Sequence, residues 1–205
     1  MTGKFITLEG IEGSGKSTSL SDITKILDKY SISYITTKEP GGGPLGTELR
    51  SLLLNKNSNI TSEVELLLMM ADRKDHVDNL ILPNLESGVW VLSDRYLDST
   101  YAYQGGGRQI ETSTIDKFAS ILNLPKPDLT ILYDLPPDVA LQRAAQRSAF
   151  DRFESEPVDF HTRIRKAYLE RAEREKERFK IVNSSTDFDG VKEQVLKIIT
   201  KFLDE

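Results

Sequence analysis

The sequence contains no cysteine among its 205 residues, which excludes disulfide bonds, thiolate zinc sites and thiol catalysis. It also lacks an excess of positive charge. Its 27 Lys and Arg are outnumbered by 32 Asp and Glu, so a net charge of −5 gives no general reason to bind nucleic acid. With 38% hydrophobic and 29% charged residues, the composition is that of an ordinary globular protein, and this argues against a membrane span or a disordered chain.

The length predicts a single domain over residues 1–205. Met1 to Lys4 lead directly into a short apolar segment, without the basic and apolar regions of a secretory signal. We therefore expect a cytoplasmic protein.

Short apolar runs rich in β-branched residues alternate with segments long enough to form helices. The strand-like runs are residues 5–8, 33–37, 89–93, 129–133 and 178–182. This alternation predicts an α/β fold with a parallel sheet and helices on both faces.

Among the helical segments, the last has one clear apolar stripe formed by Val191, Val195, Ile198 and Phe202. Residues 157–179 also read as a helix. The stretch 61–86 is more apolar over residues 64–70 than one helix face requires. Part of that surface could face a partner subunit, or the helix could be wrapped by its own domain.

Residues 10–17 form the most informative motif. Gly-Ile-Glu-Gly-Ser-Gly-Lys-Ser matches G-x-x-x-x-G-K-[ST] and lies between a predicted strand and a predicted helix. Backbone N–H groups of such a loop cradle phosphates, Lys16 reaches the β and γ oxygens, and the Ser17 hydroxyl can bind Mg²⁺. The chain is therefore predicted to bind a nucleoside triphosphate with magnesium.

The residues that follow bear on where the γ-phosphoryl group goes. A GTPase should carry Asn-Lys-x-Asp, but residues 55–58 read Asn-Lys-Asn-Ser. The strand at 89–93 ends in Asp94 and Arg95. An aspartate there can hold the magnesium's water shell, and the adjacent arginine is suited to a second anion in the same cleft. Two anions imply a donor and an acceptor.

The segment 94–108 closely resembles the thymidylate kinase signature, with Asp-Arg-Tyr followed by Ser-Thr-Tyr-Ala-Tyr-Gln-Gly-Gly-Gly-Arg. The resemblance covers nearly the whole chain, in the family's order and spacing. It implies a P-loop nucleoside-monophosphate-kinase fold with a five-stranded parallel sheet, a homodimer, and a lid at about 143–156. The implied reaction transfers the γ-phosphoryl group of ATP to dTMP, giving dTDP and ADP in dTTP synthesis, with Mg²⁺.

The resemblance also implies roles for individual residues. Arg95 would bridge the donor and acceptor phosphates, and Arg50 would clamp the dTMP phosphate. Arg73 and Thr100 would meet the thymine edge, whereas Tyr103 and Gln104 would crowd the 2′ position of the sugar. The full predicted sets are catalytic Lys16, Arg95, Arg152 and Glu12; ATP-binding Gly10, Ile11, Glu12, Gly13, Ser14, Gly15, Lys16, Ser17, Thr18, Arg143 and Arg147; substrate-binding Glu12, Pro40, Arg50, Met69, Arg73, Arg95, Ser99, Thr100, Tyr103 and Gln104; and metal-binding Ser17 and Asp94.

Two positions distinguish branches or variants of the family. One branch has an arginine where this chain has Gly13, so the chain resembles the bacterial-type branch, in which a lid supplies the charge. Arg143, Arg147 and above all Arg152 are the candidates. Met69 stands where the family commonly has a phenylalanine that stacks on thymine, and a thioether can also lie on that ring. A cis peptide is expected at Glu39-Pro40.

Each assignment has an alternative. Arg73 could be a surface helix residue, Tyr103 could be core packing, and the lid arginines could be a solvated helix end. The acceptor could instead be dUMP, dGMP or a deoxynucleoside. From another class, the chain could be a nucleotide-binding regulatory module without turnover. The expected partners are ATP and dTMP, with no nucleic acid and no membrane.

Overall fold

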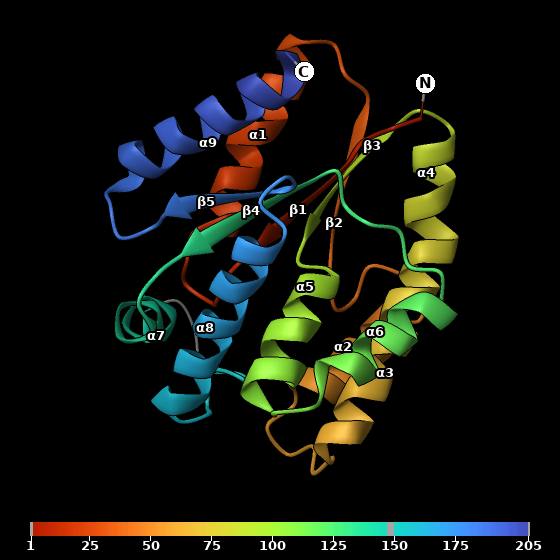
Figure 1. Ribbon diagram of the computed structural model, residues 1–205, viewed down its shortest axis with the longest axis vertical. Coiled ribbons are helices and arrows are strands. Elements are labelled where there is room, and N and C mark those ends of the chain that lie inside the picture. Colours follow the sequence, from red (N-terminus) through yellow and green to blue (C-terminus); the bar gives the residue numbers. More distant parts are fainter. Residues whose placement is uncertain (1, 147–149, 205) are drawn as a thin grey trace.

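The computed structural model describes residues 2–146 and 150–204. They form one parallel sheet with helices around it (Figure 1). The strands are β1 (Phe5–Glu9), β2 (Tyr34–Lys38), β3 (Trp90–Asp94), β4 (Leu129–Asp134) and β5 (Phe179–Asn183). They lie in the order β2-β3-β1-β4-β5, and all four neighbouring pairs are parallel. The predicted fold class is confirmed, and each strand begins within one residue of its predicted start.

Helical segments connect the strands. They are α1 (Lys16–Lys29), α2 (Gly46–Leu54), α3 (Ser62–His76), a π-helical turn η1 (Val77–Ile81), α4 (Leu82–Glu86), α5 (Leu97–Thr100), a second π-helical turn η2 (Tyr101–Gly107), α6 (Thr112–Ile121), α7 (Pro137–Ala145), α8 (Val158–Arg174) and α9 (Phe188–Asp204). None of the helices within residues 2–146 and 150–204 combines the length and apolar character that crossing a membrane requires.

Helices cover the sheet on both faces (Figure 1). On one face, α1 and α9 pack side chains such as Leu27 and Val195 against β1, β3 and β4. On the other face, α8 packs Ile164 and Tyr168 against β4 and β5. The three central strands β3, β1 and β4 are buried from both sides, whereas the edge strands β2 and β5 carry exposed residues. The central strands therefore read as largely continuous apolar runs rather than as alternating patterns.

The stretch 61–86 forms one long helical rod made of α3, η1 and α4. The Thr61 hydroxyl accepts a hydrogen bond from the Val64 amide at 3.4 Å and so caps the first turn. The apolar run 64–70 is only partly covered by the protein's own domain. Leu66 and Met70 are buried in the protein's own core, whereas Val64 and Leu67 are exposed.

Turn η2 packs closely on α8, and two glycines explain how. A Cβ on Gly106 would lie 2.6 Å from the Ala167 Cβ, and one on Gly107 would lie 2.5 Å from the Phe160 ring. Only glycine permits this approach. Turn η2 places Tyr103 and Gln104 at the carboxyl edge of the sheet.

The carboxyl ends of all five strands point to one edge of the sheet, where an α/β protein builds its site. The loop 10–15 follows β1, the cis Glu39-Pro40 peptide follows β2, and Arg95 follows β3. The expectation of a cis peptide at this position is confirmed.

Candidate active site

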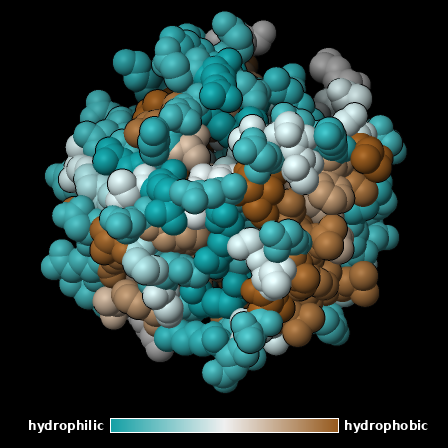
Figure 2. All heavy atoms as spheres, turned by 60° about the horizontal axis from the view of Figure 1, so that its bottom comes forward, coloured by the Kyte–Doolittle hydropathy of each residue, from teal (hydrophilic) through white to brown (hydrophobic). Residues whose placement is uncertain are grey.

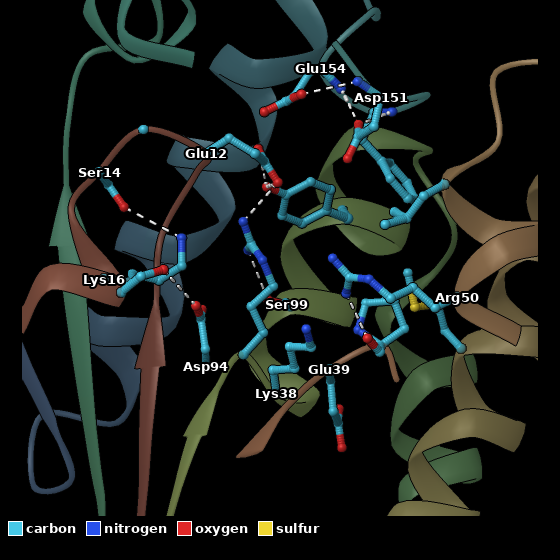
Figure 3. Close-up of a pocket in the computed structure, with 18 of the residues that line it drawn as sticks. Glu12, Ser14, Lys16, Lys38, Glu39, Arg50, Asp94, Ser99, Asp151 and Glu154 are labelled. Carbon is cyan, nitrogen blue, oxygen red and sulfur yellow. Dashed lines mark hydrogen bonds and ion pairs between the residues drawn. The ribbon is translucent and has the colours of Figure 1, made fainter. Parts of the chain in front are cut away.

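A cavity of about 510 Å³ opens at this carboxyl edge (Figure 3). It is lined by residues 12–18 and 38–40, and by Arg50, Leu54, Met69, Arg73, Asp94, Arg95, Ser99, Thr100, Tyr103, Gln104, Arg143, Asp151, Phe153 and Glu154. Most of the residues singled out from the sequence are therefore brought together. Gly10, Ile11 and Arg152 are not among the lining residues, and Arg147 lies outside the described residues.

Loop 10–15 turns sharply between β1 and α1. Gly10, Gly13 and Gly15 have φ values of 135°, 74° and 94°, in the region that side chains disfavour. Gly13 has a further reason to lack a side chain, because a Cβ there would lie 2.5 Å from the Ala140 carbonyl oxygen. The structure has no room at this position for the arginine of the other family branch unless α7 moves.

Lys16 begins α1 and folds back over the loop. Its Nζ donates to the Gly10 carbonyl at 2.9 Å and to the Ile11 carbonyl at 3.0 Å. Burial, together with the nearby positive charge of Arg95, lowers the pKa of Lys16 to about 8. A phosphate in the loop would offer the ammonium group the anionic partner that it lacks.

Ser17 and Asp94 face one another at the loop 10–15 end of the cavity. The Ser17 hydroxyl donates to Asp94 Oδ2 at 3.4 Å, while the buried Asp94 Oδ1 has no partner among the described residues. The described residues contain no group of three or more acidic or His side chains that could hold a metal by themselves. One hydroxyl and one carboxylate with a spare oxygen fit Mg²⁺, which keeps several waters and binds mainly through substrate phosphates.

Arg95 lies between the two ends of the cavity. Its Nη2 donates to Glu12 Oε1 at 2.7 Å, and its guanidinium lies 5.0 Å from the centre of the Tyr103 ring. The Tyr103 hydroxyl donates to both oxygens of the same carboxylate. Burial would raise the pKa of Glu12, but Arg95 and Lys16 outweigh burial and lower it. Glu12 is therefore ionised and orients both side chains.

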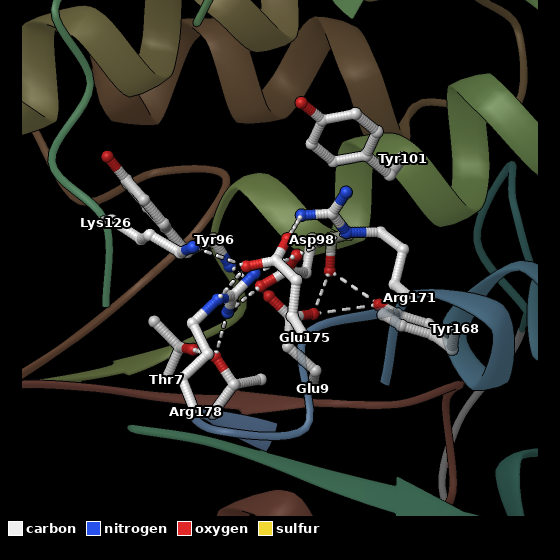
Figure 4. Close-up of polar contacts among 12 residues, drawn as sticks. Thr7, Glu9, Tyr96, Asp98, Tyr101, Lys126, Tyr168, Arg171, Glu175 and Arg178 are labelled. Atoms are coloured by element: carbon white, nitrogen blue, oxygen red, sulfur yellow. Dashed lines mark hydrogen bonds and ion pairs between the residues drawn. The ribbon is translucent and has the colours of Figure 1, made fainter. Parts of the chain in front are cut away.

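The backbone at Arg95 is strained, with a φ of 73°. Buried Glu9 in β1 holds the strained turn in place (Figure 4). It accepts hydrogen bonds from the Tyr96 amide at 2.8 Å and the Ser99 hydroxyl at 2.6 Å, and from the Tyr168 hydroxyl at 2.9 Å. Ser99 and Tyr168 in turn accept from Arg95 Nη1, each at 3.2 Å.

A second buried carboxylate, Asp98, ties the same turn to α8 and to the residue that precedes β5 (Figure 4). Arg171 of α8 donates to it at 2.7 Å, and Arg178 before β5 donates to both of its oxygens at 2.7 and 2.9 Å. Such paired and hydrogen-bonded charges fix geometry well, and removing one partner would leave an uncompensated buried charge. The Arg95 turn is thus set by α8 and β5 as well as by β1.

Arg73 is buried beneath the other end of the cavity, not on a helix surface. Its Nε donates to Glu39 at 2.7 Å, its Nη1 to the Thr100 hydroxyl at 2.7 Å, and its Nη2 to the Tyr96 carbonyl at 3.0 Å. Glu39 also pairs with His76 at 2.8 Å. The guanidinium is therefore held in one orientation next to Thr100, as a residue that reads a flat polar edge must be.

The remaining predicted acceptor residues line the same end. Arg50 Nη1 donates to the Pro40 carbonyl at 2.6 Å, and Met69 contributes its thioether to the wall. Tyr103 both lines the cavity and packs edge-on against Phe153 and Phe160. The core-packing alternative for Tyr103 is therefore compatible with a place in the site.

Two of the three lid arginines fall in the described residues, and they differ. Arg143 lines the cavity and donates to the Ser184 carbonyl at 3.1 Å. Arg152 donates instead to the Leu53 carbonyl and to Glu65, each at 2.7 Å. The structure therefore does not bring Arg152 to the phosphate loop as the sequence led us to expect, because a buried carboxylate and a helix end hold its guanidinium.

Several lining residues had no role assigned from the sequence. Glu39 directly follows β2, and it pairs with Arg73, which lies 34 positions away in the sequence. No local sequence pattern indicates such a pair. Asp151, Phe153 and Glu154 fall within the predicted lid at 143–156. Lys38 and Leu54 carry no signal that distinguishes them from ordinary strand and helix ends.

Comparison with known proteins agrees with this geometry. A sequence model of the thymidylate kinase family matches residues 8–195. Thymidylate kinase of Carboxydothermus hydrogenoformans is 47% identical over 184 residues, covering 89% of this chain and 90% of that protein. The Nitrosomonas eutropha enzyme is 42% identical over 201 residues, covering 98% and 94%. A crystal structure of thymidylate kinase from Ehrlichia chaffeensis superposes with a TM-score of 0.78 at 31% identity, covering 98% of this chain and 99% of that one.

Proposed function

The chain belongs to the thymidylate kinase family, and we propose that it phosphorylates dTMP to dTDP, a step in dTTP synthesis, with ATP as the donor and Mg²⁺ as the cofactor. One observation carries the proposal beyond family membership. A single cavity holds Lys16 and the phosphate loop at one end and Arg50 at the other (Figure 3). Arg95, paired with Glu12 of the loop, lines the same cavity. Such a site suits two phosphorylated ligands that meet in the middle.

At the donor end, loop 10–15 and the N-terminus of α1 bind the β- and γ-phosphates, and Lys16 leaves the loop carbonyls to pair with them. Ser17 and Asp94 hold Mg²⁺, which neutralises phosphate charge when bound. The base of the triphosphate nucleotide lies in a neighbouring hollow of about 230 Å³. Arg143, Phe188 and Val191 are among the residues that line this hollow.

At the acceptor end, Arg50 binds the dTMP phosphate and Arg73 with Thr100 meets the thymine edge. A cationic donor beside the O4 position favours an acceptor oxygen over an amino group, and so favours thymine over cytosine. Met69 lies against the base. Tyr103, held by Glu12, crowds the sugar's 2′ position and selects deoxyribose, with Gln104 behind it.

The transfer needs no general base, because the attacking phosphate oxygen of dTMP is already ionised. Arg95 spans the two phosphates and, with Lys16, neutralises the charge that spreads over the transferring group. Glu12 fixes Arg95 in position through the 2.7 Å contact. Residues 143–156 form a lid that closes over both nucleotides and excludes water, so that ATP is not hydrolysed without an acceptor.

We also propose that two copies of the chain form a homodimer through α3 and α6. Leu67 is 51% exposed next to a shallow hollow lined by Met70, Phe118 and Leu122. Figure 2 shows hydrophobic side chains gathered on one side of the molecule, toward these helices. A second copy presenting the same surface would cover both leucines at once, which is the usual form of a two-fold interface.

A coupled ADP-release assay tests the proposal. It uses ATP and Mg²⁺ with dTMP, dUMP, ribosyl TMP, dCMP or thymidine, and a control without acceptor. We expect a strong preference for dTMP and slow turnover without acceptor. Arg95→Ala should lower kcat by about 10³-fold or more, by analogy with arginines that stabilise phosphoryl transfer. The exposed Arg174→Ala serves as the control and should keep wild-type turnover.

The other outcomes are equally informative. Activity on thymidine but not on dTMP would remove the acceptor-phosphate role of Arg50 and Arg95. ATP binding without turnover on any acceptor would favour a regulatory module.

A further inference from the structure

Arg152 forms both backbone and side-chain contacts with the end of α2. Its amide donates to the Leu54 carbonyl at 3.2 Å, and its Nε donates to the Leu53 carbonyl at 2.7 Å. Helix α2 ends at Leu54, and the last four carbonyls of a helix have no partner within the helix. Arg152 therefore caps α2, with its positive charge at the negative end of the helix dipole.

The same guanidinium reaches α3. Arg152 Nη1 donates to Glu65 Oε2 at 2.7 Å, and Glu65 is only 1% exposed. Gln104 donates to the same carboxylate at 2.7 Å and Arg108 donates at 3.1 Å, so Glu65 is the centre of a buried cluster. A buried carboxylate is costly without such partners, and this cost holds the cluster together. Arg152 thus ties residues 150–157 to α2, α3 and η2.

The elements joined by Arg152 are those that carry the acceptor end of the cavity. Arg50 lies on α2, three residues before Leu53, and lines the cavity. Phe153 packs under the Arg152 guanidinium at 4.5 Å and also lines the cavity. Any shift of α2 relative to residues 150–157 would therefore move Arg50.

We propose that Arg152 is a positioning residue, which docks the C-terminal part of the lid on α2 and α3 and thereby places Arg50 for the acceptor phosphate. The proposal rests on the proposed function, because it assigns the acceptor phosphate to Arg50. It differs from the role expected from the sequence, in which Arg152 meets the transferring phosphoryl group. Its Nε and Nη1 are both bonded to protein groups outside the cavity, and reaching the phosphates would require breaking both contacts.

The two roles predict different kinetics. A residue that stabilises the transition state lowers kcat and leaves acceptor affinity unchanged, whereas a residue that places Arg50 alters the affinity for the acceptor. The test compares Arg152→Ala, Arg152→Lys and Glu65→Gln with wild type. For each, dTMP binding is measured by calorimetry without ATP, and kcat and KM are measured for dTMP and for ATP.

We expect Arg152→Ala to weaken dTMP binding about tenfold or more, with KM for ATP within twofold of wild type and kcat lowered less than tenfold. The dTMP affinity of Arg152→Lys should lie between those of wild type and Arg152→Ala. A lysine can donate to the Leu53 carbonyl or to Glu65, but it cannot bridge the two as the guanidinium does. Glu65→Gln should act in the same direction. Arg174→Ala is the exposed control, and thermal unfolding without ligand shows that each variant is folded.

A double-variant experiment isolates the route through Arg50. If Arg152 acts by placing Arg50, then Arg152→Ala should weaken dTMP binding no further in an Arg50→Ala background. Equal losses in both backgrounds would overturn the proposal. A kcat loss near 10³-fold with unchanged dTMP affinity would also overturn it.

If Arg152→Ala does not fold, Arg152→Lys and Glu65→Gln provide the same comparison. A folded wild-type protein that binds ATP but no dTMP would instead contradict the proposed function, and this is measured before any variant.

Discussion

At the scale of single residues, Lys16 shows how burial prepares a group for its ligand. Burial and the positive charge of Arg95 together lower the pKa of its ammonium group to about 8. As the pH rises through this value, the free protein loses the charge that should bind the triphosphate. Bound phosphates favour the charged form and raise the pKa again.

We therefore predict that kcat/KM for ATP falls as pH rises above about 8, because this parameter reports ionisations of the enzyme before ATP binds. The kcat itself should persist to higher pH, since it reports the complex. Both are measured at constant ionic strength with saturating dTMP. Glu12→Gln is the matched variant, because Glu12 raises the pKa of Lys16. In this variant, the decline of kcat/KM with rising pH should begin at a lower pH than in wild type. A wild-type kcat/KM that stays flat to pH 10 would contradict the prediction.

Most residues that line the cavity were predictable from the sequence, but the partners that hold their side chains in place were not. Lys16 and Ser17 followed from a local motif, and Arg73 from its place in a family pattern. The partners of Arg73 are Glu39 and Thr100, which lie 34 and 27 positions away. Such contacts form only when the sheet brings the segments together, so no local pattern shows them. The contacts of Arg152 were not predictable for a related reason, since nothing near it in the sequence indicates its ion pair with Glu65.

At the scale of elements, the central strands β1, β3 and β4 were predictable because a strand buried on both faces must be a short apolar run. The π-helical turns at 77–81 and 101–107 were not. Turn η2 owes its shape to the close approach of Gly106 and Gly107 to α8, which is a tertiary contact. The local sequence indicates only a glycine-rich turn.

Loop 10–15 allows an element-scale prediction that separates strain from steric contact. Gly13 and Gly15 both have positive φ, but a Cβ on Gly13 would lie 2.5 Å from the Ala140 carbonyl oxygen, whereas one on Gly15 would meet nothing within 4 Å. Gly15→Ala should therefore cost about 1 kcal/mol of backbone strain. Gly13→Ala should cost clearly more, because α7 must shift as well.

Thermal unfolding of the two alanine variants without nucleotide measures this difference. The expected order of unfolding midpoints is wild type, then Gly15→Ala, then Gly13→Ala. Equal midpoints for the two variants would show that α7 shifts away from the new side chain without a loss of stability. The contact at Ala140 would then not explain the absence of a larger residue at position 13.

At the scale of the whole molecule, the apolar run 64–70 divides between two surfaces. Leu66 and Met70 are buried within the chain, while Leu67 is 51% exposed on α3. The sequence could not separate these roles, because helical periodicity does not say what covers each face. The structure shows that the chain itself leaves Leu67 half uncovered, and the proposed homodimer would cover it.

We predict that Leu67→Glu converts the dimer to a monomer, because it buries two like charges facing each other at a two-fold interface. Sedimentation equilibrium measures the association state. The control is Ile181→Glu on β5, which is 50% exposed at the opposite end of the sheet and should leave the dimer intact (Figure 1). Both positions are about half exposed in the single chain, so neither substitution should unfold it. A Leu67→Glu protein that sediments as a dimer would place the interface elsewhere, and a monomeric wild type would contradict the homodimer itself.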